Sequence, residues 1–465
     1  MADVVEQLAG VLPAERLLTG ADIGEDYTHD ECLTVEAGTP SVVVRPESTE
    51  EVATVLRYAD AERIPVTARG AGTGLSGAAR PGESSILVSF ERMNQLLEID
   101  TANNVAVVQP GIQLDQLDEL TKPHGLAYQV YPGEYSASLG GNISTNAGGM
   151  RAVRYGVTRH NVLGLELALA GGDVIRTGGR IVKSSTGYDL TQLVIGSEGT
   201  LALVTEATLK LHPRVAHQAT VLAPFTTLEQ VTDAVPRIID SGVDPLILEY
   251  IDLLTMSATQ SYCGLELGIP QEIKDTALAY LVVMVENPIE ERLDQDTQRL
   301  AEQLSELGAI DVFVLPPNSA AELIDAREKA FWMAKANGAD DVIDVVVPRA
   351  AIPDFMQAVS GLATEHEAWI AGCGHAGDGN VHLGIFCADD AKRSALLLDL
   401  FRTGMDLGGS ISGEHGIGHA KKPYFNQLED PNKIALMRRI KAAFDPNGIM
   451  NPGVVFDGDA HTHGD

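Results

Sequence analysis

The sequence predicts an α+β protein with two structurally different halves. Short apolar runs alternate with helix-forming segments up to about residue 215, which indicates a domain of interleaved strands and helices. Beyond that point the apolar runs lie between amphipathic helices, a pattern typical of a mostly antiparallel sheet with helices packed on it. The length of 465 residues also exceeds what one compact core supports, so we expect at least two domains.

The first half contains signals for both strands and a capped helix. Its predicted strands are apolar runs bounded by turn residues, and they cover residues 41–44, 64–68, 85–90 and 104–111. A capping box, with Ser48 at the cap and Glu51 three residues later, predicts a helix that starts after Ser48. Residues 161–178 predict a hairpin closed by a Gly-Gly-Asp turn.

The second half predicts a split βαβ arrangement. Its expected strands are the apolar runs 219–225, 245–251, 278–286 and 310–315, and its expected helices are 289–307, 319–336 and 432–444. The tail from residue 457 carries His461 and His463. For that tail we favour a frayed terminus over a loose metal site.

Composition excludes several classes of protein. Asp plus Glu is 65 against 33 Lys plus Arg, so the net charge of −32 disfavours binding to nucleic acid or an anionic membrane. The four cysteines form no C-x-x-C pair, which argues against an iron–sulfur cluster or zinc ribbon. No secretory signal and no apolar run of about 20 residues is found, so we expect no transmembrane segment and a cytoplasmic protein.

Glycine-rich loops mark a candidate anion site. Gly72, Gly74 and Gly77 form a G-x-G-x-x-G pattern after a predicted strand, but Pro81 soon follows and leaves no room for the helix of a dinucleotide-binding unit. The alternatives are a nest of backbone N–H groups for an oxyanion and a plain turn. Similar loops at residues 132–149 and 196–211 favour a nest for a large phosphorylated ligand.

Two histidines in "GHAGDGNVHLG" form a candidate metal site. Glycine turns between His375 and His382 let both imidazoles reach one ion, and Glu414 of "SGEHGIG" is a candidate third ligand. In an extended chain His415 points the other way, toward a substrate. Zinc suits this ligand set, and manganese or iron would also fit. A structural turn and a metal-dependent hydrolase remain alternatives to a redox site.

An ordered set of motifs carries a resemblance to a known family. "RGAGTGLSG", "ASLGGNISTNAGG", "STGYDLTQLVIGSEGTLALVTEATLKLHP", "GHAGDGNVHL", "ISGEHGIG" and "FDPNGIMNPG" resemble the FAD-dependent D-2-hydroxyacid dehydrogenases, which include D-lactate dehydrogenases and glycolate oxidase large subunits. The resemblance implies a two-part FAD-binding domain of the PCMH, or vanillyl-alcohol-oxidase, type at 1–215. It also implies a ferredoxin-like cap with the metal site at 216–445, and a C-terminal segment at 446–465 that returns to the FAD domain.

The resemblance also assigns cofactor residues. Those expected to line non-covalent FAD are Arg69, Gly70, Ala71, Gly72, Thr73, Gly74, Gly77, Pro132, Gly133, Ser138, Gly141, Asn142, Ser144, Asn146, Ala147, Gly148, Glu198, Gly199, Val204 and Asn451. No histidine or cysteine in these loops matches a covalent flavin link.

The same resemblance implies the chemistry. A cation held by His375, His382 and Glu414 would stabilise the developing alkoxide of a 2-hydroxy acid, and His415 would accept the hydroxyl proton. Arg327 matches the family's carboxylate-binding arginine, although an exposed helix arginine is the bland alternative.

The expected substrate is a small D-2-hydroxy acid such as D-lactate. Relatives that act on D-2-hydroxyglutarate carry a lysine on the strand after the Arg327 helix and an asparagine where this chain has Gly384, and the region 337–348 has no basic residue here. A glycolate oxidase FAD subunit and a D-2-hydroxyglutarate dehydrogenase remain the alternatives, and a flavin-binding protein without activity is a further one.

Partners follow from the expected reaction. An external electron acceptor must receive the electrons, because the chain has no clustered cysteines for an internal relay. That acceptor could place the protein at the periphery of a membrane. A homodimer is one option for its assembly.

Overall fold

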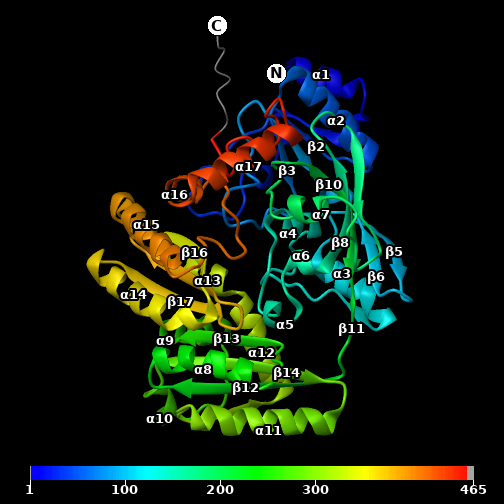
Figure 1. Ribbon diagram of the computed structural model, residues 1–465. Coiled ribbons are helices and arrows are strands. Elements are labelled where there is room, and N and C mark those ends of the chain that lie inside the picture. Colours follow the sequence, from blue (N-terminus) through cyan, green and yellow to red (C-terminus); the bar gives the residue numbers. More distant parts are fainter. Residues whose placement is uncertain (1, 458–465) are drawn as a thin grey trace.

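The N-terminal half is built on a small sheet with a parallel core in the computed structural model, which describes residues 2–457 (Figure 1). The strand order is β1-β2-β4-β3. Its parallel strands are β2 (Val42–Val44), β4 (Ile86–Ser89) and β3 (Val66–Arg69), and β1 (Leu17–Leu18) pairs antiparallel at the edge. The predicted strands at 41–44, 64–68 and 85–90 are therefore confirmed. The tail histidines His461 and His463 lie outside the described residues.

The predicted helix cap forms with one change. Helix α2 (Thr49–Glu62) begins after Ser48, whose Oγ accepts the backbone N–H of Glu51 at 3.3 Å. The Glu51 carboxylate accepts the N–H of Glu47 at 2.7 Å, one residue before the position expected in a capping box. Both interactions satisfy N–H groups that precede or open the helix, so the local sequence fixes where α2 starts.

A second, antiparallel sheet completes the first lobe. Its order is β5-β6-β10-β8-β9. The strands are β5 (Leu96–Asp100), β6 (Val105–Val108), β10 (Leu203–Lys210), β8 (Val162–Ala168) and β9 (Val174–Gly178). Strands β8 and β9 form the predicted hairpin. Apolar residues of α2 share one core with Ala168 and Leu203, so the two sheets pack as one lobe.

The second lobe contains a seven-stranded antiparallel sheet of order β15-β12-β14-β13-β17-β18-β16. Its first four strands are β12 (His217–Phe225), β13 (Ile247–Asp252), β14 (Ala279–Asn287) and β15 (Phe313–Leu315). Helices α8 (Leu228–Asp240) and α11 (Glu290–Glu306) make the two crossovers. The order 4-1-3-2 of these strands is the predicted ferredoxin-like split βαβ arrangement.

Three further strands extend this sheet toward the first lobe. They are β17 (Trp369–His375), β18 (Asn380–Phe386) and β16 (Asp341–Val346). Side chains alternate between the two faces of each strand. The rear face packs into the large core with α8, α11, α14 (Ile352–Glu365) and α15 (Asp390–Asp406). The opposite face of these strands, called the front face below, carries Asp344, His375 and His382.

The predicted helix at 319–336 is wrong in one respect, because it forms as two helices. They are α12 (Pro317–Glu328) and α13 (Ala330–Ala336), separated at Lys329 with φ −81° and ψ 7°. Helix α12 buries Leu323 and Ala326 in the cap core, whereas Phe331 of α13 lines a cavity. Because of the break, α12 packs on the cap core while α13 lines the cavity.

The C-terminal segment returns to the first lobe as predicted. After α16 (Lys422–Leu428) and α17 (Pro431–Phe444), the N–H of Val66 donates to the carbonyl of Ile449, and the N–H of Asn451 donates to the carbonyl of Val66, both at 2.8 Å. These bonds attach residues 449–451 to the edge of β3. The domain boundaries at residues 215 and 445 stay predictions.

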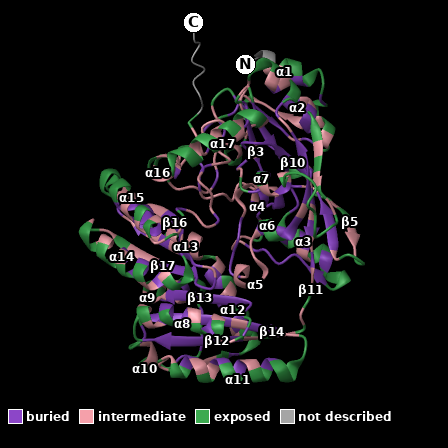
Figure 2. Ribbon diagram, viewed as in Figure 1, coloured by how far each residue is buried: buried purple, intermediate pink, exposed green. Residues whose placement is uncertain are grey.

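Burial follows the layers. Figure 2 shows the strands of both lobes mostly buried, with the outer faces of the surrounding helices exposed. Within residues 2–457 the structure contains no helix long and apolar enough to cross a membrane.

Candidate functional site

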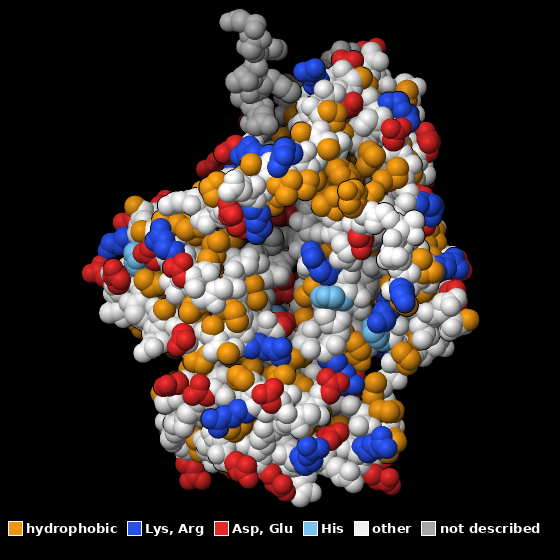
Figure 3. Space-filling view, viewed as in Figure 1, with side chains coloured by type: hydrophobic (Ala, Val, Ile, Leu, Met, Phe, Trp, Pro, Cys, Tyr) orange, Lys and Arg blue, Asp and Glu red, His pale blue; other side chains and the backbone are white. Residues whose placement is uncertain are grey.

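Two adjoining cavities lie where the lobes meet, and Figure 3 shows the surface hollowed between them. The glycine-loop cavity, of about 170 Å³, lies in the first lobe. The cap cavity, of about 570 Å³, is walled mainly by the second lobe. The residues that line both are Thr73, Leu75, Pro132, Glu134, Glu414 and His415.

Most of the predicted cofactor residues line the glycine-loop cavity. They are Arg69, Gly70, Ala71, Gly72, Thr73, Gly74, Pro132, Ser138, Gly141, Asn142, Ser144, Ala147, Glu198, Gly199, Val204 and Asn451. Gly133 lines the cap cavity instead. Gly77, Asn146 and Gly148 line neither cavity.

The wall of the glycine-loop cavity is made of closely packed backbone. Ser138 caps α4 (Leu139–Thr145), and its Oγ accepts N–H groups from Gly141 at 3.3 Å and from Ala71 at 3.2 Å. A Cβ on Gly70 would lie 2.0 Å from that Oγ. The side-chain nitrogen of Asn142 is buried in this wall without a hydrogen-bond partner. The cavity therefore offers close backbone approach and an unused donor to a ligand.

The side chain of Arg69 packs against this loop. Its Nη1 donates to the carbonyl of His29 at 2.6 Å, and a Cβ on Gly72 would lie 2.0 Å from its Nη2. Gly72 has φ +79°, a conformation that glycine adopts without strain. Burial lowers the pKa of Arg69, and the nearby Asp30 opposes that shift. The arginine thus fixes the shape of the loop as well as lining the cavity.

Glu198 joins the two lobes beside the same cavity. Its carboxylate oxygens accept the N–H groups of Ile417 and Gly418, each at 2.8 Å. Its carbonyl accepts the side-chain amide of Asn451 at 2.8 Å. Burial raises the pKa of Glu198 to about 7, against the lowering effect of the two backbone donors. The C-terminal segment and the "SGEHGIG" loop therefore meet at one residue of the first lobe.

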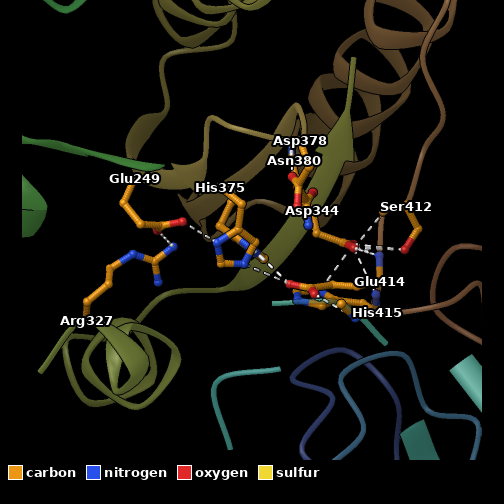
Figure 4. A network of polar contacts seen from close by, with 12 residues as sticks. Glu249, Arg327, Asp344, His375, Asp378, Asn380, Ser412, Glu414 and His415 are labelled. Carbon is orange, nitrogen blue, oxygen red and sulfur yellow. Dashed lines mark hydrogen bonds and ion pairs between the residues drawn. The ribbon is translucent and has the colours of Figure 1, made fainter. Parts of the chain in front are cut away.

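The three predicted metal ligands are brought together. Their candidate ligand atoms all lie within 4.8 Å of one another. Oε1 of Glu414 is 3.3 Å from Nε2 of His375 (Figure 4). The same oxygen is 3.1 Å from Nε2 of His382. The His382 nitrogen is buried but makes no well-aligned hydrogen bond to that oxygen. Two imidazoles and one carboxylate, with the His382 nitrogen left without a hydrogen bond, form a donor set that fits a divalent cation.

Glu249 on β13 completes this cluster, and sequence reasoning missed it. Nδ1 of His375 donates to Oε1 of Glu249 at 2.5 Å, and Nη2 of Arg327 lies 2.9 Å from Oε2 (Figure 4). Burial alone would lower the pKa of His375, but Glu249 and Glu414 outweigh it and raise that pKa to about 10. A carboxylate behind a ligating histidine fixes the ring and increases its basicity. The available signal was a glutamate inside the apolar run at 245–251.

Asp344 on β16 is the second residue that sequence reasoning missed. It is fully buried, and Oδ2 accepts the N–H groups of Gly413 at 3.0 Å, Glu414 at 2.7 Å and His415 at 2.8 Å. Lys421 pairs with its other oxygen. Burial alone would raise the pKa of Asp344, but His415 and Lys421 outweigh it and hold that pKa at about 2. Asp344 thereby shapes the loop that presents Glu414 and His415.

His415 lies at the junction of the two cavities. Its Nδ1 is 3.2 Å from Oδ1 of Asp344, close enough for an ion pair but off the line of a hydrogen bond. Its ring centroid is 5.3 Å from that of His382. Burial lowers the pKa of His415 to about 4, against the opposing effect of Asp344. The imidazole is therefore neutral at pH 7 and has a proton-accepting nitrogen beside the His375, His382 and Glu414 cluster.

Arg327 faces the cap cavity from α12. It is only 6% exposed, and its Nε and Nη2 make no well-aligned hydrogen bond. The alternative interpretation is an exposed helix arginine paired with Asp325 or Glu328. It is wrong because Arg327 is buried and Asp325 pairs with Lys329 at 2.6 Å. The guanidinium is paired with Glu249 on one side, and its donors without a well-aligned hydrogen bond fit a carboxylate ligand.

Comparison with known families identifies the chain. Residues 214–455 match the family described as FAD linked oxidases, C-terminal domain, and residues 40–178 match the FAD binding domain family. The first match alone covers more than half of the chain. The chain belongs to the FAD-linked oxidases. It is an FAD-linked oxidoreductase, and the glycine-loop cavity lies in the part that matches the FAD-binding domain.

Relatives of this FAD-linked oxidase span its whole length. It is 59% identical to an FAD-linked oxidoreductase of Mycobacterium tuberculosis over 98% of this chain and 99% of that protein. It is 37% identical to a D-lactate dehydrogenase of Anaerostipes hadrus over 97% of both chains. It is 36% identical to a glycolate oxidase subunit of Bacillus subtilis over 90% of both.

A solved structure confirms the PCMH-type fold. p-Cresol methylhydroxylase aligns with a TM-score of 0.79 over 98% of this chain and 97% of that chain, at 18% identity. At that identity the likeness concerns the fold alone.

Proposed function

We propose that this FAD-linked oxidase converts a D-2-hydroxy monocarboxylate to the 2-oxo acid. The observation that carries the proposal is the buried guanidinium of Arg327, which faces the same cavity as the His375, His382 and Glu414 cluster. A substrate whose carboxylate binds Arg327 would have its 2-hydroxyl group directed toward that cluster and toward His415. The names of the Anaerostipes and Bacillus relatives support this reaction class.

FAD would occupy the glycine-loop cavity and extend toward His415. Bound FAD supplies the acceptor for the hydride that leaves C2. Among the described residues that line this cavity, His415 is the single histidine and there is no cysteine, which supports a non-covalent cofactor. The Gly70–Gly74 loop, held by the bond from Ala71 to Ser138, would bind the pyrophosphate through its other backbone N–H groups.

A divalent cation, zinc first and manganese or iron as alternatives, would be held by His375, His382 and Glu414. When bound it supplies Lewis acidity at the substrate hydroxyl. Glu249 orients His375, and Gly148 donates its N–H to Oε2 of Glu414 at 3.1 Å. Both ligand side chains are thereby fixed before a metal arrives.

The chain's own residues divide the remaining work. Arg327 binds the carboxylate with a planar fork of donors and so orients C2. His415 accepts the hydroxyl proton at Nε2, because Asp344 faces its Nδ1. The resulting imidazolium is stabilised by the carboxylate of Asp344. This balances the reaction, since the substrate loses one hydride from carbon and one proton from oxygen.

The charges of the cap cavity favour a monocarboxylate. Among the described residues that line it, Arg327 is the single Lys or Arg. Glu31, Glu134 and Glu328 also line it and supply no positive charge, so the lining offers no partner for a second carboxylate. This disfavours the 2-hydroxyglutarate alternative. D-Lactate, as predicted from the sequence, is a member of the proposed class, and the achiral monocarboxylate glycolate has the same single carboxylate.

Anaerobic mixing of the purified holoenzyme with D- and L-2-hydroxy acids tests the proposal. We expect the visible flavin absorption to bleach with D acids and to persist with L acids, and metal analysis to find about one divalent ion per chain. Turnover with a dye acceptor and no added subunit would argue against an obligate glycolate oxidase complex. A colourless protein that hydrolyses esters or amides would overturn the proposal in favour of a metal-dependent hydrolase.

A further inference from the structure

We propose that the preferred substrate carries a long apolar side chain on C2. This inference rests on the proposed function and specifies its substrate class. The cap cavity measures about 570 Å³, within the range of roughly 300–1,000 Å³ typical of sites for drug-sized ligands. The part lined by residues shared with the glycine-loop cavity would take the flavin ring. A three-carbon acid bound at Arg327 would still leave to water the part lined by Ala371, Gly384 and Phe386.

The shape of the cavity follows from strand register. On the front face of β17 and β18, Cys373 lies opposite His382, Ala371 opposite Gly384, and Trp369 opposite Phe386. Small residues therefore follow the metal histidines, and aromatic residues come last. At about 3.3 Å per residue, the track from His382 to Phe386 is about 13 Å long.

The other walls of this track are apolar as well. Leu254 and Ala258 of α9 (Leu253–Cys263) and Phe331 and Met333 of α13 line the same cavity. Trp369 is 72% exposed, so the aromatic end opens to solvent and does not limit the length of a ligand. Apolar surface of this extent gains most when an apolar chain covers it.

Three acidic groups of the wall each have one partner, although Oε2 of Glu328 is buried without a hydrogen bond. Glu31 pairs with Lys335 at 2.6 Å, and Glu134 accepts from the indole of Trp332 at 3.2 Å. Glu328 accepts from the hydroxyl of Tyr135 at 3.2 Å. These contacts join the first lobe to α12 and α13 and leave no cation for a polar tail. Among the described residues the cavity thus has one Lys or Arg, at Arg327, and its apolar wall is the track along β17, β18, α9 and α13.

Gly384 keeps the track open next to the metal cluster. A Cβ built there would lie 3.6 Å from Cβ of Ala334 and 3.7 Å from the Phe386 ring, which is ordinary contact. The residue does not have a positive φ, so a larger side chain can be introduced without backbone strain. It would extend into the space between the histidines and the aromatic end.

Turnover of the holoenzyme with a series of D-2-hydroxy acids tests this inference. The probes are lactate, 2-hydroxybutyrate, 2-hydroxyhexanoate, 2-hydroxyoctanoate and 2-hydroxyglutarate, with a dye acceptor. We expect kcat/KM to rise about fourfold per added methylene up to 2-hydroxyoctanoate, and 2-hydroxyglutarate to be poor. Oxidation of lactate with weaker turnover of the longer acids would overturn the inference and leave the proposed function intact. Failure of every acid to reduce the flavin would refute both.

Gly384→Val sharpens the test at one position. We expect the ratio of kcat/KM for 2-hydroxyoctanoate to that for lactate to fall at least tenfold, and to fall less in Gly384→Ala. Gly361→Val, the same change on the exposed face of α14 where a Cβ would meet nothing within 4 Å, is the matched control and should keep the wild-type ratio. Unchanged ratios in folded, flavin-loaded Gly384 variants would contradict the proposed track.

Discussion

The two cavities at the centre of the molecule are built from different materials. The glycine-loop cavity is shaped by main chain, where Ser138 and Glu198 serve chiefly to hold backbone N–H groups in place. The cluster of His375, His382 and Glu414 is shaped by side chains, with both histidines on the front face of one sheet and Glu414 on a loop bound to Asp344 of that sheet. Substitutions that add side-chain atoms should therefore weaken ligand binding in the glycine-loop cavity. Substitutions that remove a side chain or its charge should weaken the His375, His382 and Glu414 site.

This difference has a physical origin in the ligands each site is proposed to hold. A pyrophosphate is large and spreads its charge over many oxygens, so closely spaced N–H groups can surround it. A metal ion is small and needs a few donors at fixed positions. Strands supply fixed positions, because neighbouring rows of a sheet are held by ladder hydrogen bonds on both sides.

The largest expected effect comes from removing His415. His415→Ala should lower kcat about 10²–10⁴-fold, the usual contribution of a general base. FAD content and bound metal should stay at wild-type levels, because His415 is not one of the three ligands. Stopped-flow flavin reduction with the best D-2-hydroxy acid measures the effect. A loss of metal together with the loss of rate would show that the side chain belongs to the metal shell instead.

A smaller effect is expected from Glu249→Gln. This change keeps the shape of the side chain but removes the charge behind His375, and should weaken metal affinity about 10–100-fold. Titration of the metal-stripped protein, followed by flavin reduction, measures it. Glu290→Gln, at the exposed start of α11, is the charge-matched control. Equal metal affinity in both variants would remove Glu249 from the proposed site.

The smallest effect is expected in the glycine-loop cavity. Gly70→Ala should force the Ser138 hydroxyl to rotate away and lose its bond from Ala71, at a cost of about 1 kcal/mol, or roughly fivefold in FAD affinity. Metal affinity should not change. Gly171→Ala, in a turn where a Cβ meets nothing within 4 Å, is the control. Fluorescence titration of the apoprotein with FAD decides the outcome, and tighter binding than wild type would contradict a backbone-built cradle.

The same contrast explains what could be predicted from the sequence. Glycine loops and the His375 and His382 pair are local patterns, so the sequence indicated both, and strand alternation indicated that Glu414 and His415 face opposite ways. Glu249 and Asp344 escaped notice because each is a single acid inside an apolar run. Their importance depends on which strand lies beside them, and β13 and β16 become neighbours of the cluster only through the order of the sheet.

The size of the substrate could not be predicted from the sequence for a related reason. The sequence shows Gly384 and the absence of a nearby lysine, and both argue against a second carboxylate. The length of the apolar track depends on Ala371 and Trp369 lying opposite Gly384 and Phe386, which is a fact of register. Sequence motifs therefore predict the groups that contact the reacting atoms of a substrate better than they predict the length of its side chain.

The bond from Gly148 of the first lobe to Glu414 of the second has a thermodynamic consequence. The Glu414 carboxylate accepts from the segment that matches the FAD-binding domain and is also one of the three proposed metal ligands. If binding of the flavin tightens that segment and so favours the cation, the cation must favour the flavin by the same factor, because such linkage is reciprocal. Stripping the enzyme of either component would then loosen its hold on the other.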